Sequence, residues 1–460
     1  MGLSDLRESV SGIKGADYAD LYASKGISHS ARYDDGRMDT ISSSQYEGLG
    51  LRVLIGENSV YSHAMGTRMS DADSAIKDAA GMSGLSIAPC GDGASLFEDR
   101  ELTLPPVETG FLRELDASLR AGCAYLKQLT FRFRSSRKLV MVIRGDGKLV
   151  RDDRVYTSFA VSVVAERDGR VETGYEARSL KIGLDDFWTA FDGEGPNSPE
   201  GIAAAALERA LKMLDARPCP AGTMTVLLDG SAGGAMIHEA CGHGLEADIV
   251  QKDFSAFRDK IDSQVASPIV TIIDDATLPG RWGSYAFDDE GSPAARNVLV
   301  KDGVLRSYMT DIFSARRGNL PVTGNGRRES YLDIPMPRMS NTFVSPGTSS
   351  FGEMLSGMES GLLVRKMGGG EVNPTSGDFV FQVTEGYLVE NGRIGPLVKG
   401  ATLAGNGPET LFGVAAVGSE LTLDSGMCGK SGQGVPVTDG QPAMLIKSLT
   451  VGGADAGNAA

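Results

Sequence analysis

The sequence predicts an α+β protein: a mixed α/β N-terminal domain followed by a largely antiparallel β C-terminal domain that carries a metal-binding helix. First, β-rich segments joined by Asp-Gly or Asn-Gly pairs, a strong hairpin signal, recur along the chain. Second, the long helical patterns lie in the first half. Third, two closely spaced histidines stand in the second half. With 460 residues, the chain is long enough for two or three domains with their own cores.

Four helices are expected in the first half, and the last has the clearest start. Ser198 can cap the N-terminus of this helix, and Pro199 suits its first position. The longest helix is predicted before it, where apolar residues recur at helical spacing. The expected helices cover residues 4–13, 71–82, 107–129 and 199–214.

Strands in the first half are expected in pairs closed by tight turns. Asp35-Gly36, Asp146-Gly147 and Asp168-Gly169 mark three of these turns. The expected strands cover residues 19–23, 30–33, 38–43, 50–55, 59–63, 138–143, 148–152, 157–166 and 170–177.

The second half is expected to consist mainly of hairpins around one special helix. A first strand leads directly into that helix, and Asp302-Gly303 and Asn391-Gly392 mark two later turns. The expected strands cover residues 224–228, 269–273, 297–300, 304–309, 380–383, 387–390 and 393–396.

Proline positions and composition predict the domain boundaries. Prolines after residue 217 indicate the end of an N-terminal α+β domain at residues 1–217, with a possible sub-boundary in the connector at 90–106. A β-rich C-terminal domain is expected over residues 218–451, and a flexible tail over 452–460.

The histidine motif predicts a metal site. His238 and His243 are two of only four histidines, and Glu239 follows the first directly. This is close to His-Glu-x-x-His, in which two histidines bind zinc and the glutamate acts as base. Five residues on a regular helix would separate the two side chains by ~140°. A π-bulge absorbs the extra residue, and Gly242 makes that distortion easier. A plain helix with incidental histidines is the less favoured reading.

A third protein ligand is needed, and the residues alone leave four candidates open. Cys241, Glu246 and Asp248 lie close to the histidines in sequence. Cys428 is distant, but glycines flank it in a polar loop, which is an unusual setting for a buried structural cysteine. A catalytic zinc site uses three protein ligands and leaves the fourth position to water.

Two other segments suggest ligand binding. Gly429-Lys430-Ser431 matches the end of a phosphate-binding loop, but Asp424 stands where the first glycine belongs, so nucleotide binding is excluded. Arg327 and Arg328 lie in an arginine-rich stretch that could hold a carboxylate of a peptide substrate. A solvated loop with ion pairs inside the chain explains them equally well.

Charge and cysteine content restrict the class of protein. A net charge of −15 argues against binding to nucleic acid or to an anionic membrane. Five cysteines spread over the chain do not resemble a disulfide framework. Since the sequence shows neither a signal peptide nor a long apolar run, a cytoplasmic protein is expected.

Several motifs together resemble the TldD/PmbA (TldE) metalloprotease family, and in particular its catalytic TldD-type chains. The resemblance covers nearly the whole chain. Its motifs are the histidine motif at 238–248, Gly-Asn-Gly-Arg-Arg-Glu-Ser-Tyr, Pro-Met-Pro-Arg-Met-Ser-Asn-Thr, Asn-Pro-Thr-Ser-Gly-Asp, Met-Cys-Gly-Lys-Ser-Gly-Gln-Gly-Val-Pro-Val and, near the N-terminus, Gly-Ala-Asp-Tyr-Ala-Asp-Leu-Tyr and Gly-Leu-Gly-Leu-Arg-Val.

The resemblance implies a zinc peptidase. It makes His238, His243 and Cys428 the Zn²⁺ ligands and Glu239 the general base, while Cys241 has no family role. It further implies a PmbA/TldE-like companion subunit or a homodimer. Its implied substrates are leader peptides and partly unfolded small proteins, cut in an enclosed chamber. The competing hypothesis is a non-catalytic regulatory or scaffold protein with a structural zinc.

Overall fold

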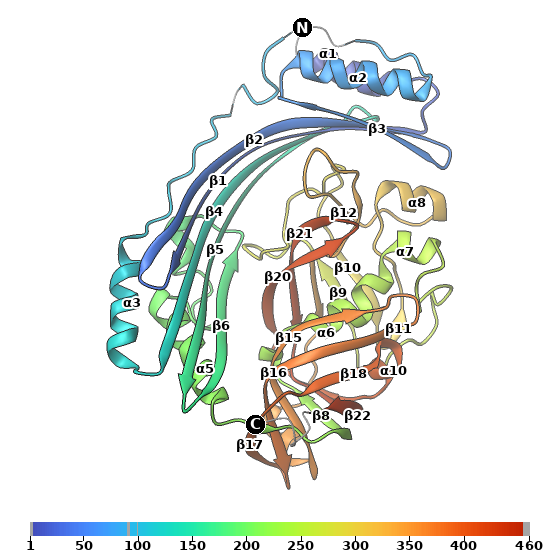
Figure 1. Cartoon of the computed structure of the whole chain (residues 1–460). Coiled ribbons are helices and arrows are strands. Elements are labelled where there is room, and N and C mark those ends of the chain that lie inside the picture. Colours follow the sequence, from blue (N-terminus) through green and yellow to red (C-terminus); the bar gives the residue numbers. More distant parts are fainter. Residues whose placement is uncertain (1–2, 90–92, 99, 454–460) are drawn as a thin grey trace.

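The computed structural model describes residues 3–89, 93–98 and 100–453, and the expected flexible tail lies outside them except for residues 452 and 453. A strongly curved sheet of long strands arches over a second, more compact part (Figure 1). The N-terminal elements are α1 (Leu3–Ser11), β1 (Tyr18–Asp34), β2 (Arg37–Ile55), β3 (Asn58–Met65), α2 (Met69–Ser83), α3 (Gly110–Gly122), β4 (Leu126–Arg144), β5 (Leu149–Arg167), β6 (Arg170–Leu180), α4 (Leu184–Phe187) and α5 (Pro199–Met213).

The curved sheet is antiparallel, in the order β3-β2-β1-β4-β5-β6. Its predicted turns are confirmed at Asp35-Gly36 and Asp168-Gly169, where both residues have positive φ, as hairpin turns of this type require. The strands are much longer than the segments expected from the sequence, because polar stretches that show little alternation still continue the pairing.

The predicted helix over residues 107–129 is wrong in its second half. Helix α3 ends at Gly122, and Leu126 begins β4. Leu129 and Phe131 pair across the sheet with Val163 and Val161 and are fully buried there. These two residues are two positions apart, which places both side chains on the buried face of a strand and on opposite sides of a helix.

The helices α1, α2, α3 and α5 pack on the convex face of this sheet. Near one end of the strands, α1 and α2 pack on Leu21, Leu51 and Met141. Towards the other end, α3 and α5 pack on Phe131 and Phe159. Since side chains alternate between faces, the residues between these point to the concave face, which is turned towards the C-terminal part.

The C-terminal part contains two larger sheets, ordered β11-β10-β9-β14-β21-β20 and β15-β8-β22-β18-β16-β17-β7. Most neighbours are antiparallel; β8–β15, β14–β21 and β7–β17 are parallel. The predicted α+β class is therefore confirmed. The strands are β7 (Arg217–Pro218), β8 (Gly222–Leu228), β9 (Ile272–Asp275), β10 (Arg296–Lys301), β11 (Val304–Leu305), β12 (Gly326–Arg327), β13 (Met336–Pro337), β14 (Asn341–Val344), β15 (Ser360–Val372), β16 (Asp378–Glu390), β17 (Arg393–Lys399), β18 (Thr402–Asn406), β19 (Val414–Val417), β20 (Thr422–Lys430), β21 (Gln433–Gln441) and β22 (Met444–Gly452).

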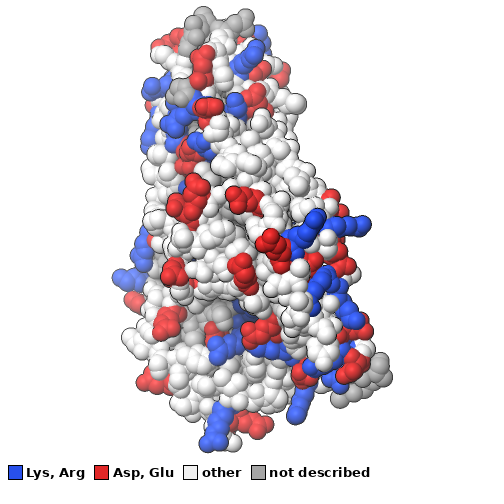
Figure 2. Space-filling view, turned by 90° about the vertical axis from the view of Figure 1, so that its left-hand side faces the viewer, with Lys and Arg blue, Asp and Glu red and all other residues white. Residues whose placement is uncertain are grey.

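The helices of this part are short. They are η1 (Gly230–Ala232), α6 (Ala235–Ile237), η2 (His238–Gly242), η3 (His243–Leu245), α7 (Ala247–Gln251), α8 (Ile312–Gly318), α9 (Phe351–Ser356) and α10 (Gly407–Phe412). Among the described residues, no helix is long and apolar enough to cross a membrane. Figure 2 shows a face of the molecule on which acidic and basic side chains are interspersed.

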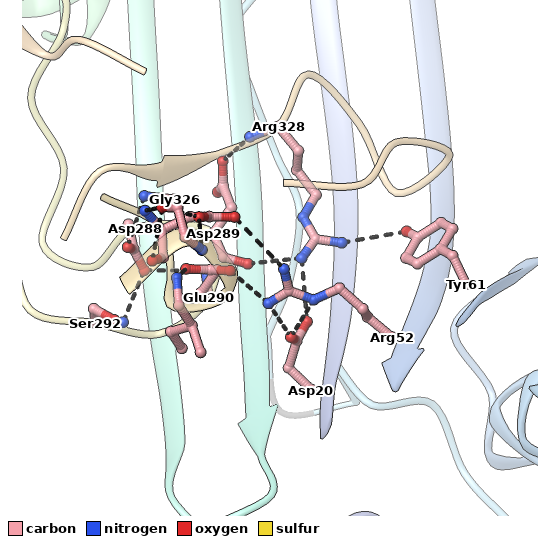
Figure 3. A network of polar contacts seen from close by, with 12 residues as sticks. Asp20, Arg52, Tyr61, Asp288, Asp289, Glu290, Ser292, Gly326 and Arg328 are labelled. Atoms are coloured by element: carbon pink, nitrogen blue, oxygen red, sulfur yellow. Dashed lines mark hydrogen bonds and ion pairs between the residues drawn. The ribbon is translucent and has the colours of Figure 1, made fainter. Parts of the chain in front are cut away.

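A buried network of charges joins the curved sheet to the C-terminal part (Figure 3). Arg52 of β2 donates to Asp20 of β1 at 2.8 Å through Nε and contacts Glu290 at 2.5 Å through Nη2. Arg328 reaches the other oxygen of Asp20 at 3.2 Å, and its backbone N–H donates to Asp289 at 2.9 Å. Because Arg52 and both its partners are at most 1% exposed, these charges depend on one another for solvation.

Replacing Arg52 with methionine should destabilise the protein by about 3–5 kcal/mol, because the buried carboxyls of Asp20 and Glu290 both lose the guanidinium group that they contact. Arg306→Met is the matched control: Arg306 pairs with Asp262, but both side chains are largely exposed, so its loss should cost less than ~1 kcal/mol. Denaturant unfolding of the two variants measures the difference. Equal destabilisation would contradict an essential role of the network.

Candidate metal centre

The motif helix contains the π-turn that the histidine spacing predicts. After one turn of α6, η2 is a π-helix, and the N–H of His243 donates to the carbonyl of His238, five residues earlier. The two imidazole rings thereby lie 4.9 Å apart, centre to centre. Gly242 lets this turn pack against the buried Met339, since a Cβ there would lie 2.0 Å from the Met339 sulfur.

Cys428 joins the two histidines from β20. Its Sγ lies 3.6 Å from Nε2 of His243, and one ligand atom from each of the three residues lies within 4.8 Å of the others. Two imidazoles and a thiolate suit a borderline-soft ion such as zinc. The sequence suggested a polar loop around Cys428, whereas the structure has a regular β20–β21 hairpin there.

Two carboxylates fix the orientation of the histidines. Nδ1 of His238 is 2.7 Å from Asp439 of β21, and Nδ1 of His243 is 3.0 Å from Glu246. In both rings Nε2 therefore remains for a metal, the usual arrangement behind metal-binding histidines. Lys430 in turn contacts Glu246 at 2.9 Å.

The other candidate ligands lie away from the metal position. Glu246 is fully buried behind His243, and Asp248 pairs with Lys430 at 2.6 Å. Cys241 is fully buried in the hydrophobic core of the C-terminal part, and burial raises its pKa to about 12. Glu246 contacts His243 at Nδ1, on the side of the ring away from Nε2, so of the sequence candidates only Cys428 lies at the metal position.

Glu239 lies at the open side of the group. Its side chain is 27% exposed, and Oε2 is 3.9 Å from Nε2 of His243. Burial raises the pKa of Glu239, which moves it towards the range in which a carboxylate exchanges protons near neutral pH. This residue can thus move a proton beside the metal position.

The ligands are electrostatically matched to one another. Burial alone would raise the pKa of the Cys428 thiol, but hydrogen bonds and charge from His238 and His243 outweigh it and lower the pKa to about 5. Burial alone would lower the pKa of His243, but Glu246 and Cys428 raise it to about 10. Without metal, the site therefore favours a thiolate beside cationic imidazole.

Arg327 and Arg328 do not lie at this centre as substrate ligands. Arg327 is buried and donates to the carbonyls of Met339 and Pro436. Arg328 is fully buried in the network that joins the two parts. Because both guanidinium groups are buried and bind groups within the chain, the structure argues against their predicted role in substrate binding.

Asp439 and Lys430 are site residues that sequence reasoning missed as such. Asp439 follows His238 by 201 positions, and no local motif surrounds it. Lys430 belongs to the segment that resembled the end of a phosphate-binding loop. In the structure it pairs with Glu246, the carboxylate that orients His243.

A cavity of about 490 Å³ lies beside β20, between this strand and β6. It is lined in part by Ser179, Trp282, Asp424 and Ser425. β20 is an edge strand. The backbone N–H of Thr438 in β21 donates to the carbonyl of Ser340, so it points away from β20. Ser425 lies opposite Thr438 in the antiparallel pair, and its backbone groups therefore point away from β21. The same holds two residues further on, for Met427.

Three segments match domains of one family. Residues 19–83 match the PmbA/TldA metallopeptidase domain 1, residues 102–214 its central domain, and residues 221–453 its C-terminal domain. The chain belongs to the PmbA/TldD metallopeptidase family. The resemblance inferred from the motifs is thereby confirmed.

Relatives in this family carry metalloprotease names. A Haemophilus influenzae protein, "Metalloprotease TldD homolog", is 38% identical over 95% of this chain and 93% of its own. A Saccharolobus solfataricus protein, "Zinc metalloprotease TldD homolog", is 31% identical over 65% of both chains. TldE from Thermococcus kodakarensis has the same fold, with a TM-score of 0.74 at 16% identity over 98% of both chains.

Proposed function

We propose that this chain is a zinc-dependent peptidase that cuts unfolded or extended peptides. The observation that carries the proposal is the convergence of His238, His243 and Cys428 with Glu239 at their open side. The metalloprotease names of the relatives support a metal-dependent activity. A purely structural zinc normally has four protein ligands, whereas three converge among the residues that the structure describes, so the regulatory or scaffold alternative is less well supported.

Bound zinc would supply the Lewis acidity that activates water and polarises a peptide carbonyl. Glu239 would accept a proton from water at its carboxylate and transfer it to the leaving amine. Asp439 and Glu246 would hold the two imidazoles with Nε2 towards the metal. The low pKa of Cys428 keeps its sulfur ready to bind metal.

The edge of β20 suits an extended substrate. Met427 presents backbone groups away from β21 directly beside Cys428, and its side chain is exposed. A peptide strand could pair there through its main chain, with little selection for its side chains. The backbone groups of a folded domain are already hydrogen-bonded within that domain and cannot pair with β20, so unfolded segments are the proposed substrates.

Glu239→Gln should reduce cleavage of unfolded peptides by ~10²- to 10⁴-fold, because the proton acceptor is lost while the shape is kept. Mass spectrometry of an unfolded peptide mixture, with stably folded domains in parallel, measures products and substrate class. Glu200→Gln, on the remote helix α5, serves as control. Wild-type rates in Glu239→Gln would exclude this residue as the base, and efficient cutting inside folded domains would exclude the extended-substrate proposal.

Cys428→Ser removes a direct ligand of the metal and should lower zinc affinity by at least ~10- to 100-fold. That is the loss typical when a residue that only hydrogen-bonds to a metal ligand is removed. Metal analysis after dialysis against a chelator measures retention, which should be about one zinc per wild-type chain. Cys241→Ser is the matched control and should keep its zinc, since Cys241 is buried away from the site. Full retention in Cys428→Ser would contradict the ligand assignment.

We also propose that the chain works as a dimer with a PmbA/TldE-like companion, or as a homodimer when alone. The structural likeness to TldE supports a family with two kinds of chain of one fold. Sedimentation of the purified chain should therefore show a dimer or association with such a companion. A fully active monomer would overturn this proposal.

A further inference from the structure

The concave face of the curved sheet carries a trough lined by arginines. Phe131 and Phe133 of β4 point to the convex face, so Arg132 and Arg134 point to the concave one. There they line a cavity of about 430 Å³. We define the arginine trough by six of its lining residues: Arg132, Arg134, Ser158, Tyr175, Ala177 and Ser179.

The two arginines of the trough are available for a ligand. Both are exposed, and within the described part of the chain neither forms a salt bridge. A third arginine on this face, Arg32, is neutralised by Asp34 at 3.1 Å and Asp39 at 3.6 Å. In a chain with a net charge of −15, a pair of uncompensated arginines in a hollow is a distinct anion-binding feature.

The trough is continuous with the cavity beside β20. Ala177 and Ser179 line both hollows. Tyr175 of the trough is close enough to Arg132 and to Asp424 of β20 for both charges to act on its hydroxyl. A chain that follows β20 away from Cys428 therefore arrives at the trough.

We propose that the arginine trough is a second binding site for the substrate, which takes a carboxylate-rich segment of the same extended peptide. This inference rests on the proposed peptidase function and adds a substrate preference to it. The guanidinium groups would bind glutamate or aspartate side chains, and the hydroxyls of Ser158, Tyr175 and Ser179 would add hydrogen bonds.

The position of the preference follows from the strand geometry. Asp424 is four residues from Cys428 on β20, a span of roughly 13 Å at 3.3 Å per residue. Asp424 is itself acidic and would repel carboxylates next to it. Acidic residues should therefore help only when they lie more than about four residues from the cleaved bond, beyond Asp424.

Peptide binding to zinc-loaded Glu239→Gln protein tests the inference without cleavage. The first pair of labelled, unstructured peptides carries a run of glutamates or a run of glutamines at the C-terminus and is otherwise identical. The second pair carries the same runs at the N-terminus. Fluorescence anisotropy should show tighter binding of one glutamate peptide. Adding Arg132→Gln or Arg134→Gln should weaken that peptide roughly two- to five-fold each and leave its glutamine partner unchanged.

Arg113→Gln is the matched control, because it removes an equal charge from an exposed position on α3, on the convex side. Arg113→Gln should leave the affinity for the glutamate peptide and for the glutamine peptide unchanged. No glutamate advantage, or an advantage that survives both trough substitutions, would overturn the inference. So would a trough substitution that changes only sedimentation, since the trough would then contact another protein chain.

The same experiment separates this inference from the proposed function. If wild-type protein cuts no peptide but the glutamate advantage depends on Arg132 and Arg134, the peptidase proposal fails and the binding site stands. If peptides are cut while glutamate and glutamine peptides bind alike, only the binding site fails.

Discussion

The metal centre depends on one close backbone contact, between the start of the motif helix and β21. A Cβ on Gly234 would lie 2.2 Å from the backbone nitrogen of Gly440 and 2.6 Å from the carbonyl carbon of Asp439. Only glycine allows the helix to begin this close to the strand. The contact places His238 against Asp439, and Cys428 follows from the neighbouring strand β20. Segments about 200 positions apart in sequence thus meet at Gly234.

Charged neighbours stabilise the buried, ionised side chains of the metal centre before any metal is bound. Three ligand side chains are largely buried, and a thiolate or an imidazolium buried alone would be costly. Here each ionised group has a partner: Cys428 lies beside the histidines, His243 faces Glu246, and Glu246 faces Lys430. A metal would replace protons on the imidazoles while the outer carboxylates and Lys430 stay in place.

The parts that sequence predicted well are those set by local geometry. The spacing of His238 and His243 allowed one solution on a helix, the π-turn, and the structure has it. The Asp-Gly turns were predictable because few residues adopt positive φ. Pairing over long distances was not predictable. The three-residue spacing of Leu126 and Leu129 fits a helix, and these residues share one face of β4 only because the pairing with β5 shifts register between Leu126 and Gln128. The role of Asp439 could not be predicted either, because its contact with His238 also depends on pairing between distant segments.

Arg327 and Arg328 show how the curved sheet and the metal centre depend on each other. Arg327 holds the carbonyl of Pro436, which lies opposite Met427 on β20, while Arg328 binds Asp20 of the curved sheet. Adjacent residues thereby connect the hairpin that carries Cys428 to the wall that carries the arginine trough. Because Arg328 is fully buried with its partners, this connection resists small shifts. A positional preference for acidic residues requires that the distance from the metal position to the trough is kept, and these buried contacts give a physical reason for it.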